Sequence, residues 1–238
     1  MDNPLKEAHV PETTIGKLFL NSRTWTNQVL EIALKDLTRL LGQESRHYTV
    51  IADVGCGYGR SLKKLSDRFK PNKLIAMDID PEMIDATKKE ARLNKLEQVE
   101  FHCCSSSMID LENESVDMLF CHQTFHHLIH QSEAIAEYFR VLKPGGVLLF
   151  AESTKRYIHS WVIRLLFRHP MDAQKTADEY LSLIRNAGFT VKNQQISYPF
   201  LWWSREDFAI MENWLGIKPP EKREETLINL IAHKPHLE

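Results

Sequence analysis

The sequence predicts a doubly wound α/β fold built around a mostly parallel sheet. Short apolar runs alternate with segments of helical periodicity, and the first such run, "TVIADV", leads directly into the glycine-rich turn "GCGYG". A lysine-proline-glycine-glycine stretch introduces a later run, "VLLFAES". In folds of this class the ligand site lies outside the carboxyl ends of the strands, so the glycine turn is expected at the site.

The first half of the predicted sheet follows from three apolar runs. Residues 49–54 form the first strand, and the helix after it stops before Pro71. Residues 73–80 form the second strand, after which Asp80 can cap a helix over 81–94 whose first residue is proline. Two strand and helix units in succession indicate the parallel arrangement.

The middle of the chain continues this alternation. Residues 98–104 and 115–122 predict the third and fourth strands, and a helix is expected over 131–142. The stretch "KPGG" at 143–146 predicts a turn, and 147–153 a fifth strand.

The two ends of the chain complete the prediction. Residues 172–189 indicate a helix that ends at Gly188 in the left-handed cap position, and 190–197 and 226–233 indicate two closing strands. The N-terminal segment 1–46 is expected to form a helical cap over the site.

Composition narrows the classes of partner and location. The 238 residues include 43% hydrophobic ones and carry a formal net charge of −2, so no overall field attracts nucleic acid. The four cysteines lack metal-ligand spacing, and no signal peptide is evident, which predicts reduced thiols in a cytoplasmic protein. No apolar run approaches the roughly 18 residues of a membrane span.

The glycine turn does not match two common nucleotide motifs. Its glycines are Gly55, Gly57 and Gly59, whereas a dinucleotide fingerprint needs its third glycine where Arg60 stands. A phosphate-binding loop needs Gly-Lys-Ser/Thr, and the lysine is missing. Glycine lets a ligand approach the backbone closely and tolerates a positive φ, so close approach is the expected use of this turn.

Four motifs in order resemble one known family. "DVGCGYG" resembles the D/E-x-G-x-G-x-G motif of class I S-adenosylmethionine-dependent methyltransferases, and "MDIDPEMI", "FHHL" and "RVLKPGGVLLF" are similar to the later motifs of that family. The resemblance covers residues 47–152. It implies a Rossmann-like fold with a seven-stranded sheet, S-adenosylmethionine as cofactor and S-adenosylhomocysteine as product.

Asp78 is the candidate ligand for a ribose. It ends the second strand 23 positions after Gly55, close to the roughly 20-residue offset at which an acidic side chain meets a ribose in such folds. An ionised carboxylate only accepts hydrogen bonds and can take both hydroxyls of a diol. The alternative is a solvated loop aspartate, although Asp80 already provides the helix cap.

The resemblance assigns further cofactor contacts. Asp53 is implied to hold the methionine ammonium, directly or through water, and it can at the same time fix the turn through backbone N–H groups. Ile79 and Met83 are implied to flank the adenine, with ordinary helix core as the alternative for Met83. After the third strand this chain has serines where many relatives have an acid. The remaining implied contacts are Gly55, Cys56, Gly57, Ser105, Ser106, Cys121 and His122.

Histidine is concentrated just past the fourth strand. His126 and His130 have helical spacing, but no acid or cysteine in this segment completes a ligand set, so no metal is expected. The resemblance places the segment between cofactor and acceptor, where His126 or His127 could remove a proton from a hydroxyl or amine. The alternative for any one of them is a histidine that satisfies local backbone groups.

Two inserts are expected to set the acceptor. Residues 155–169 carry four Lys/Arg and no acid, which indicates an amphipathic lid helix rather than a membrane-surface element. The segment "FLWWSREDFAIMENWLG" adds an aromatic cluster that could wall an acceptor pocket. The domain prediction is a cap over 1–46 and a methyltransferase domain over 47–238, with inserts at about 155–172 and 199–222.

The sequence therefore predicts methyl transfer to a small molecule with an apolar or aromatic body. "FCHQTFHH" has neither the Asp/Asn-Pro-Pro-aromatic motif of DNA amino methylases nor the Pro-Cys of cytosine C5 enzymes, so nucleic acid is not expected. Aminopropyl transfer and a non-catalytic cofactor-binding subunit are the alternatives. The acceptor atom and the oligomeric state are left open.

Overall fold

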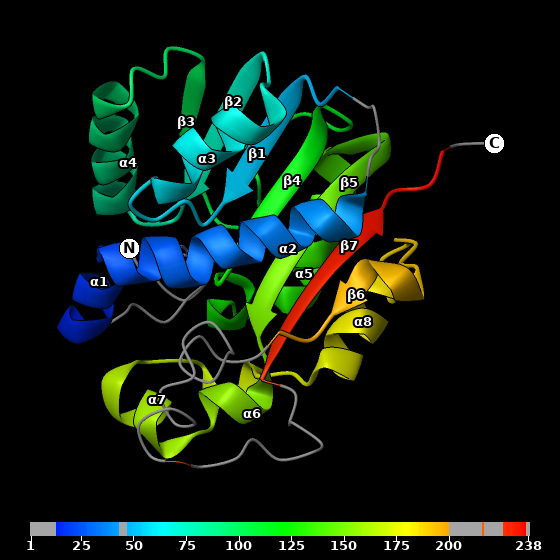
Figure 1. The fold of residues 1–238 in the computed structure, drawn as a ribbon. Coiled ribbons are helices and arrows are strands. Elements are labelled where there is room, and N and C mark those ends of the chain that lie inside the picture. Colours follow the sequence, from blue (N-terminus) through cyan, green and yellow to red (C-terminus); the bar gives the residue numbers. More distant parts are fainter. Residues whose placement is uncertain (1–12, 43–46, 200–215, 217–225, 237–238) are drawn as a thin grey trace, which may run out of the picture.

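A computed structural model describes residues 13–42, 47–199, 216 and 226–236, and it contains a seven-stranded sheet between helices (Figure 1). The strands are β1 (Val50–Val54), β2 (Lys73–Asp78), β3 (Val99–Cys103), β4 (Val116–His122), β5 (Leu142–Ser153), β6 (Ile196–Ser197) and β7 (Leu227–His233). Their order across the sheet is β3-β2-β1-β4-β5-β7-β6, and β7 runs antiparallel to both of its neighbours. The predicted doubly wound α/β fold is confirmed.

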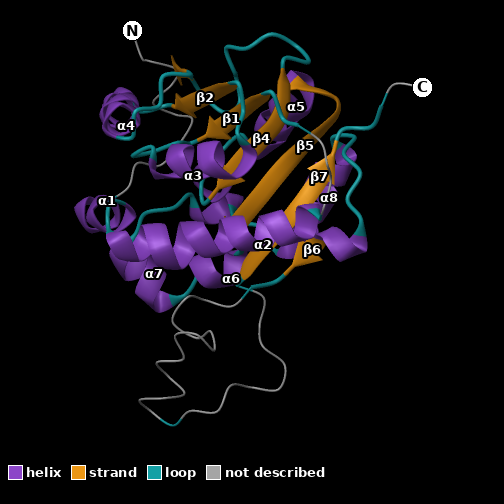
Figure 2. Cartoon of the chain, turned by 45° about the horizontal axis from the view of Figure 1, so that its top comes forward, coloured by secondary structure: helices purple, strands orange, loops and turns teal. Residues whose placement is uncertain are grey.

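Helices cover both faces of this sheet (Figure 2). They are α1 (Thr14–Leu20), α2 (Glu31–Leu41), α3 (Arg60–Phe69), α4 (Pro81–Leu93), α5 (Gln131–Val141), α6 (Lys155–Ile158), α7 (Trp161–Leu166) and α8 (Ala177–Asn186). Apolar side chains of α2, α3 and α4 pack in one core cluster, and those of α5 and α8 pack in the other. Each side of the sheet therefore has its own core.

The register of the central strands brings three chain segments to one edge. Val54, the last residue of β1, lies opposite Met77 of β2 and Cys121 of β4. Because these strands are parallel, the loops that follow them leave the sheet at the same edge. Helices α1, α6 and α7 lie toward this end of the sheet in Figure 1.

Local sequence signals account for the better predicted boundaries. The Asp80 carboxylate accepts a hydrogen bond from the backbone N–H of Glu82, and Pro81 opens α4, as expected. Thr176 and Glu179 form a reciprocal capping box at the start of α8, so this helix begins later than the predicted range 172–189. Gly188 follows the helix with φ +103°.

Three predicted elements differ from the structure. The "KPGG" stretch lies within β5 and not in a separate turn, and the β4-β5 register shifts there between Val116 and Met118. Most of 190–197 is not strand, since only β6 and an isolated bridge at Thr190 pair with β7. The insert 155–169 forms two short helices, α6 and α7, and not one.

The N-terminal segment is helical, as predicted, over its described part. A π-helical segment, Trp25–Leu30, runs directly into α2. Such π-helical turns are uncommon and occur often at functional sites. Among the described residues, no helix is both long and apolar enough to cross a membrane.

Candidate functional site

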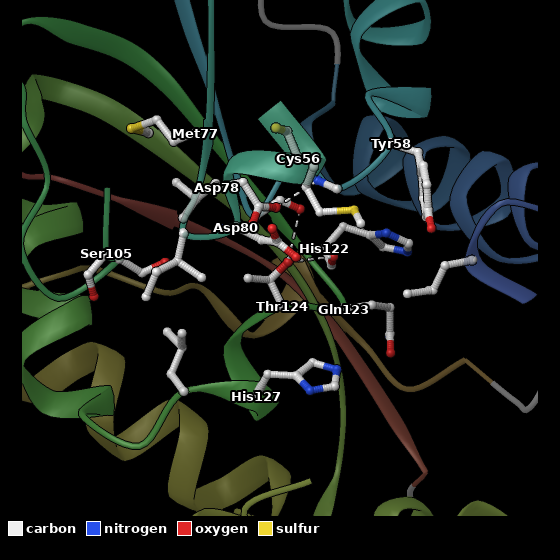
Figure 3. Close-up of a pocket in the computed structure, with 18 of the residues that line it drawn as sticks. Cys56, Tyr58, Met77, Asp78, Asp80, Ser105, His122, Gln123, Thr124 and His127 are labelled. Carbon is white, nitrogen blue, oxygen red and sulfur yellow. Dashed lines mark hydrogen bonds between the residues drawn. The ribbon is translucent and has the colours of Figure 1, made fainter. Parts of the chain in front are cut away.

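A cavity of about 170 Å³ opens where β1, β2 and β4 end (Figure 3). We call it the glycine-loop cavity, because the loop after β1 forms one of its walls. It brings together most of the residues predicted to contact a cofactor. Those lining it are Gly55, Cys56, Gly57, Asp78, Ile79, Met83, Ser105, Ser106 and His122.

Two glycines of the loop are needed for different reasons. Gly55 has φ +70°, and a Cβ on it would lie 2.2 Å from Cγ2 of Thr124, so the loop packs against the segment after β4 only with glycine here. Gly57 has φ +50°, and nothing in the chain lies within 4 Å of a Cβ placed on it. The space beside Gly57 is therefore open to a ligand.

Asp78 organises the loop from the end of β2. One carboxylate oxygen accepts a hydrogen bond from the backbone N–H of Gly57 at 2.9 Å, and the other accepts from the N–H of Asp80 at 3.0 Å. The side chain also lines the cavity, and an ionised carboxylate only accepts hydrogen bonds. The arrangement is compatible with the predicted ribose contact.

Asp53 lies below the loop and does not line the cavity. Its side chain is buried and accepts a hydrogen bond from the hydroxyl of Ser61. Burial raises the pKa of Asp53 to about 7, with the Ser61 hydrogen bond opposing the rise and the charge of Asp78 adding to it. Asp53 therefore lies behind the cavity wall, where its carboxylate binds the hydroxyl of Ser61 at the start of α3.

Cys121 is also absent from the cavity wall. The side chain is fully buried between β4 and its neighbours, with its sulfur 3.8 Å from the hydroxyl of Tyr138 and 3.5 Å from a carboxylate oxygen of Glu152. Its neighbour His122 does reach the cavity, because successive side chains of a strand point to opposite faces.

His122 has a buried nitrogen with no partner. Its side chain is 6% exposed, and Nε2 makes no hydrogen bond to any described residue. The ring packs against Trp25 and Phe120, with centroids 5.4 and 5.8 Å away. Burial lowers the pKa of His122 to about 4, so the imidazole is neutral at pH 7. An unpaired polar atom in this position favours a ligand that supplies the missing partner.

The serines after β3 have local partners. The Ser105 hydroxyl lies 2.8 Å from that of Ser107 and accepts from the Ser107 backbone N–H at 3.2 Å, which forms a tight turn. Ser105 and Ser106 both line the cavity, and these bonds already use part of the capacity of Ser105.

A second cavity, of about 100 Å³, lies beside the first. We call it the apolar cavity, because more than half of the side chains that line it are aliphatic or aromatic, and many of these come from α1, the π-helical segment, α2, α6 and α7. Tyr157 and Phe167 belong to the predicted insert 155–169. The two cavities have five lining residues in common, which are Leu20, Trp25, His122, Gln123 and His127.

The predicted catalytic histidines lie where the two cavities meet. His126 lines the apolar cavity, and His127 lines both. Figure 3 shows His127 and Gln123 on the side of the glycine-loop cavity opposite Cys56. His130 is half exposed at the start of α5 and lines neither cavity, so the helical pair of His126 and His130 is not formed.

Glu152 holds this turn in place. It is fully buried in β5 and accepts hydrogen bonds from the backbone N–H groups of Thr124 and Phe125, both at 2.8 Å. Its second oxygen lies 2.6 Å from Nδ1 of His126. Burial would raise the pKa of Glu152, but the hydrogen bond and charge of His126, together with the two N–H groups, hold it below its ordinary value.

Sequence reasoning missed several residues of the site. Glu152 could have been noticed, because an acid within the apolar run "VLLFAES" needs buried partners. Trp25 and Thr124 carry no such signal, since only the fold brings the N-terminal helix and the segment after β4 to the cavity. The tryptophan segment 202–214 and the side chain of Trp161 lie outside the described residues.

Comparisons with known proteins agree on one family. A family model described as a methyltransferase domain matches residues 52–150. The chain is 32% identical over 156 residues to an uncharacterized methyltransferase-like protein of Schizosaccharomyces pombe, covering 64% of this chain and 58% of that protein. It is 30% identical over 182 residues to an uncharacterized methyltransferase of the same organism, covering 74% and 70%.

Two further similarities come from bacteria. The chain is 25% identical over 165 residues to a malonyl-acyl-carrier-protein O-methyltransferase of Marinomonas sp., covering 68% of this chain and 60% of that protein. A crystal structure of a SAM-dependent methyltransferase from Aquifex aeolicus has the same fold, with a TM-score of 0.65 at 19% identity and coverage of 92% and 96%. The chain spans about three fifths of the length of the S. pombe methyltransferase-like protein and of the Marinomonas enzyme.

Proposed function

Because this chain belongs to the class I S-adenosylmethionine-dependent methyltransferases, we propose that it transfers a methyl group to a small molecule with an apolar or aromatic body. S-adenosylmethionine is its cofactor and supplies a methyl group that its sulfonium already activates for transfer. The chain's own residues then have to bind the acceptor, orient it toward the methyl group and exclude water. The observation that carries the proposal is the apolar cavity that adjoins the glycine-loop cavity.

Three features of the glycine-loop cavity fit this cofactor. The space beside Gly57 is empty, so the backbone can be approached closely. Asp78 lines the cavity with an acceptor-only carboxylate, which suits the two hydroxyls of a ribose. Ile79 and Met83 add apolar wall for the adenine. Asp53 supports the loop from below and acts on the methionine ammonium through the loop or through water.

The apolar cavity is the proposed acceptor site. Its aliphatic and aromatic wall suits a flat or apolar molecule, and closure of the cavity removes water from the place of methyl transfer. Leu20 and Trp25 belong to both cavities, so a molecule in one lies next to a molecule in the other. Small size is favoured because the cavity has a volume of only about 100 Å³.

His126 and His127 are the candidate proton acceptors. The side chain of His126 is fixed by Glu152, which leaves its second ring nitrogen for the cavity. From this position a histidine can take the proton of the acceptor's hydroxyl or amine while the acceptor's oxygen or nitrogen forms its bond to the methyl carbon. Acceptors that ionise unaided need no such base.

Other acceptors and partners are less well supported. Relatives of this chain are named for malonyl-acyl-carrier protein, for ubiquinone and menaquinone biosynthesis and for tRNA. A net charge of −2 gives no overall field that attracts RNA. The basic residues of 155–169 permit contact with a membrane surface, but Ile158 and Ile163 face the apolar cavity and so favour a lid.

The experiment follows a deuterated methyl group from S-adenosylmethionine into either a small-molecule extract or total tRNA. Mass spectrometry is expected to find the label in a compound of low mass, with S-adenosylhomocysteine formed in equal amount. Label found in tRNA alone would contradict the acceptor class. Aminopropyl transfer would instead need decarboxylated S-adenosylmethionine as the donor and would release methylthioadenosine from it. Bound cofactor without any turnover would indicate a non-catalytic subunit.

A further inference from the structure

Three histidine rings meet at the edge of the apolar cavity. His126 and His127 follow β4, and His169 comes from the chain after α7. The ring centroids of His126 and His127 are 4.3 Å apart. The ring centroid of His169 lies 5.1 Å from that of His126 and 4.7 Å from that of His127. One ring nitrogen of each histidine lies within 4.8 Å of the other two.

We propose that His126, His127 and His169 bind one divalent transition-metal ion at the wall of the apolar cavity. Imidazole is a preferred ligand of zinc, cobalt, nickel, copper and iron, and three histidines with an open fourth position are a known catalytic arrangement for zinc. All three residues line this cavity, so an ion bound by them faces the space where an acceptor would lie. The bound ion would then take the place of His126 and His127 in promoting loss of the acceptor's proton, because it lowers the pKa of a hydroxyl that binds to it.

The buried carboxylate of Glu152 supports the proposal independently. It accepts from Nδ1 of His126 at 2.6 Å, which leaves Nε2 as the ring atom that can bind an ion. Metal-binding histidines usually donate their other ring nitrogen to a carboxylate or carbonyl in this way, which fixes the ring and raises its basicity. The Gln174 side chain also donates to the backbone carbonyl of His126, so this turn is held from two sides.

The remaining geometry needs a small adjustment. In a tetrahedral site with metal–nitrogen bonds of about 2.05 Å, the nitrogens lie about 3.3 Å apart. The present separations of up to 4.8 Å therefore have to shorten by about 1.5 Å. His127 and His169 are only partly buried, so their rings can rotate by this amount.

Sequence spacing could not find this site. It paired His126 with His130, which lies outside the cavity, whereas His169 is 43 positions further along the chain than His126. The acceptor class that follows rests on the proposed function: an apolar or aromatic body with a hydroxyl, phenol or carboxylate oxygen that can bind the ion.

The test uses the full chain without a histidine tag, stripped with a chelator and titrated with Co²⁺. Visible absorption reports the number and type of ligands, and Zn²⁺ should displace the cobalt at one ion per chain. His169→Asn is expected to weaken Co²⁺ binding at least tenfold. His130→Asn is the matched control, since it removes a nearby histidine outside the cavity and should leave the binding unchanged.

Glu152→Gln gives a second measurement. Loss of such a supporting carboxylate typically weakens metal binding about 10- to 100-fold, and the change leaves all three histidines in place. Wild-type protein that binds no more Co²⁺ than His169→Asn would overturn the inference, as would equal losses in His169→Asn and His130→Asn. S-adenosylhomocysteine affinity, measured in parallel, tests the proposed function separately, because His169 does not line the glycine-loop cavity.

Discussion

The two cavities of this protein are built in different ways. The glycine-loop cavity is formed mainly by the segments that follow β1, β2 and β4, and its shape depends on backbone conformation. The apolar cavity takes its wall from the N-terminal helices, the turn after β4, the insert with α6 and α7, and β7. The sheet thus determines the first cavity, whereas side chains from four separate regions determine the second.

This difference separates what a family shares from what one member recognises. Loops at the ends of parallel strands meet wherever the sheet forms, so the same cofactor can bind in many relatives. Inserts beyond the strands can change without altering the sheet, so they are free to fit different acceptors. Substitutions in the two cavities should therefore affect different ligands.

The largest expected effect is that of Gly57→Val on the glycine-loop cavity. A branched side chain would fill the open space beside the loop, and the affinity for S-adenosylhomocysteine should fall more than about 100-fold, or roughly 3 kcal/mol. Calorimetry measures the affinity, and circular dichroism checks the fold.

Gly42→Val is the matched control for this change. Gly42 also has a positive φ, of +78°, and no chain atom within 4 Å of an added Cβ, but it lies after α2 and lines neither cavity. It should also strain the backbone, since Gly42 has φ +78° and ψ −168°, but without loss of affinity. Equal losses in both variants would mean that strain, and not occupied ligand space, explains the result.

Asp78→Ala should have the next largest effect. The change removes the proposed ribose ligand and also the acceptor for the Gly57 N–H, so affinity for S-adenosylhomocysteine should fall about 10- to 100-fold. Asp85→Ala, an exposed carboxylate in α4, is the control and should leave affinity unchanged. A loss of less than threefold would show that Asp78 does not bind the ribose.

Most of the sheet could be predicted because its signals are local. The apolar runs of β1, β2, β4 and β7, the proline after Asp80 and the glycine turn each identify an element within a few residues. The "KPGG" stretch has the composition of a turn and predicts one. Its pairing with β4 nevertheless keeps it within β5 as a bulge. Pairing between distant segments overrides local preference there.

The same reasoning explains which site residues were found. Gly57 and Asp78 stand in motifs whose spacing places them at strand ends, and both line the cavity. Asp53 belongs to the same motif but points beneath the loop, which spacing alone does not specify. Trp25 and His169 could not be predicted, because they reach the site only through the packing of distant segments.

Phe167→Ala should affect the acceptor and not the cofactor. Phe167 lines the apolar cavity but not the glycine-loop cavity. Its ring packs edge-on against that of Phe19, with the centroids 5.9 Å apart. Losing part of this wall should raise the KM for an apolar acceptor about fivefold, or roughly 1 kcal/mol, with S-adenosylhomocysteine affinity constant. Leu165→Ala, which changes a side chain 74% exposed in α7, should alter neither quantity. A loss of cofactor affinity in Phe167→Ala would show that the two cavities act as one.

Asp53→Asn should have the smallest effect on ligand binding and a clear effect on stability. Burial raises the pKa of Asp53 to about 7 from an ordinary value of 3.8, so between about pH 4 and 7 the folded chain holds a proton that the unfolded chain releases. The contribution of Asp53 to the free energy of unfolding is therefore fully present below pH 4 and is lost as the pH rises to 7, a change of at most about 4 kcal/mol. Asparagine keeps an acceptor for the Ser61 hydroxyl and does not titrate in this range.

Urea unfolding from pH 4 to 8 measures this effect. The free energy of unfolding of Asp53→Asn should rise relative to that of the wild type as the pH rises, while Asp67→Asn, which changes an exposed residue of α3, follows the wild type. Parallel curves for Asp53→Asn and wild type would mean that Asp53 ionises normally. A loss of S-adenosylhomocysteine affinity above tenfold would instead favour direct contact between Asp53 and the cofactor, which would make both the loop and the side chain beneath it part of the first cavity.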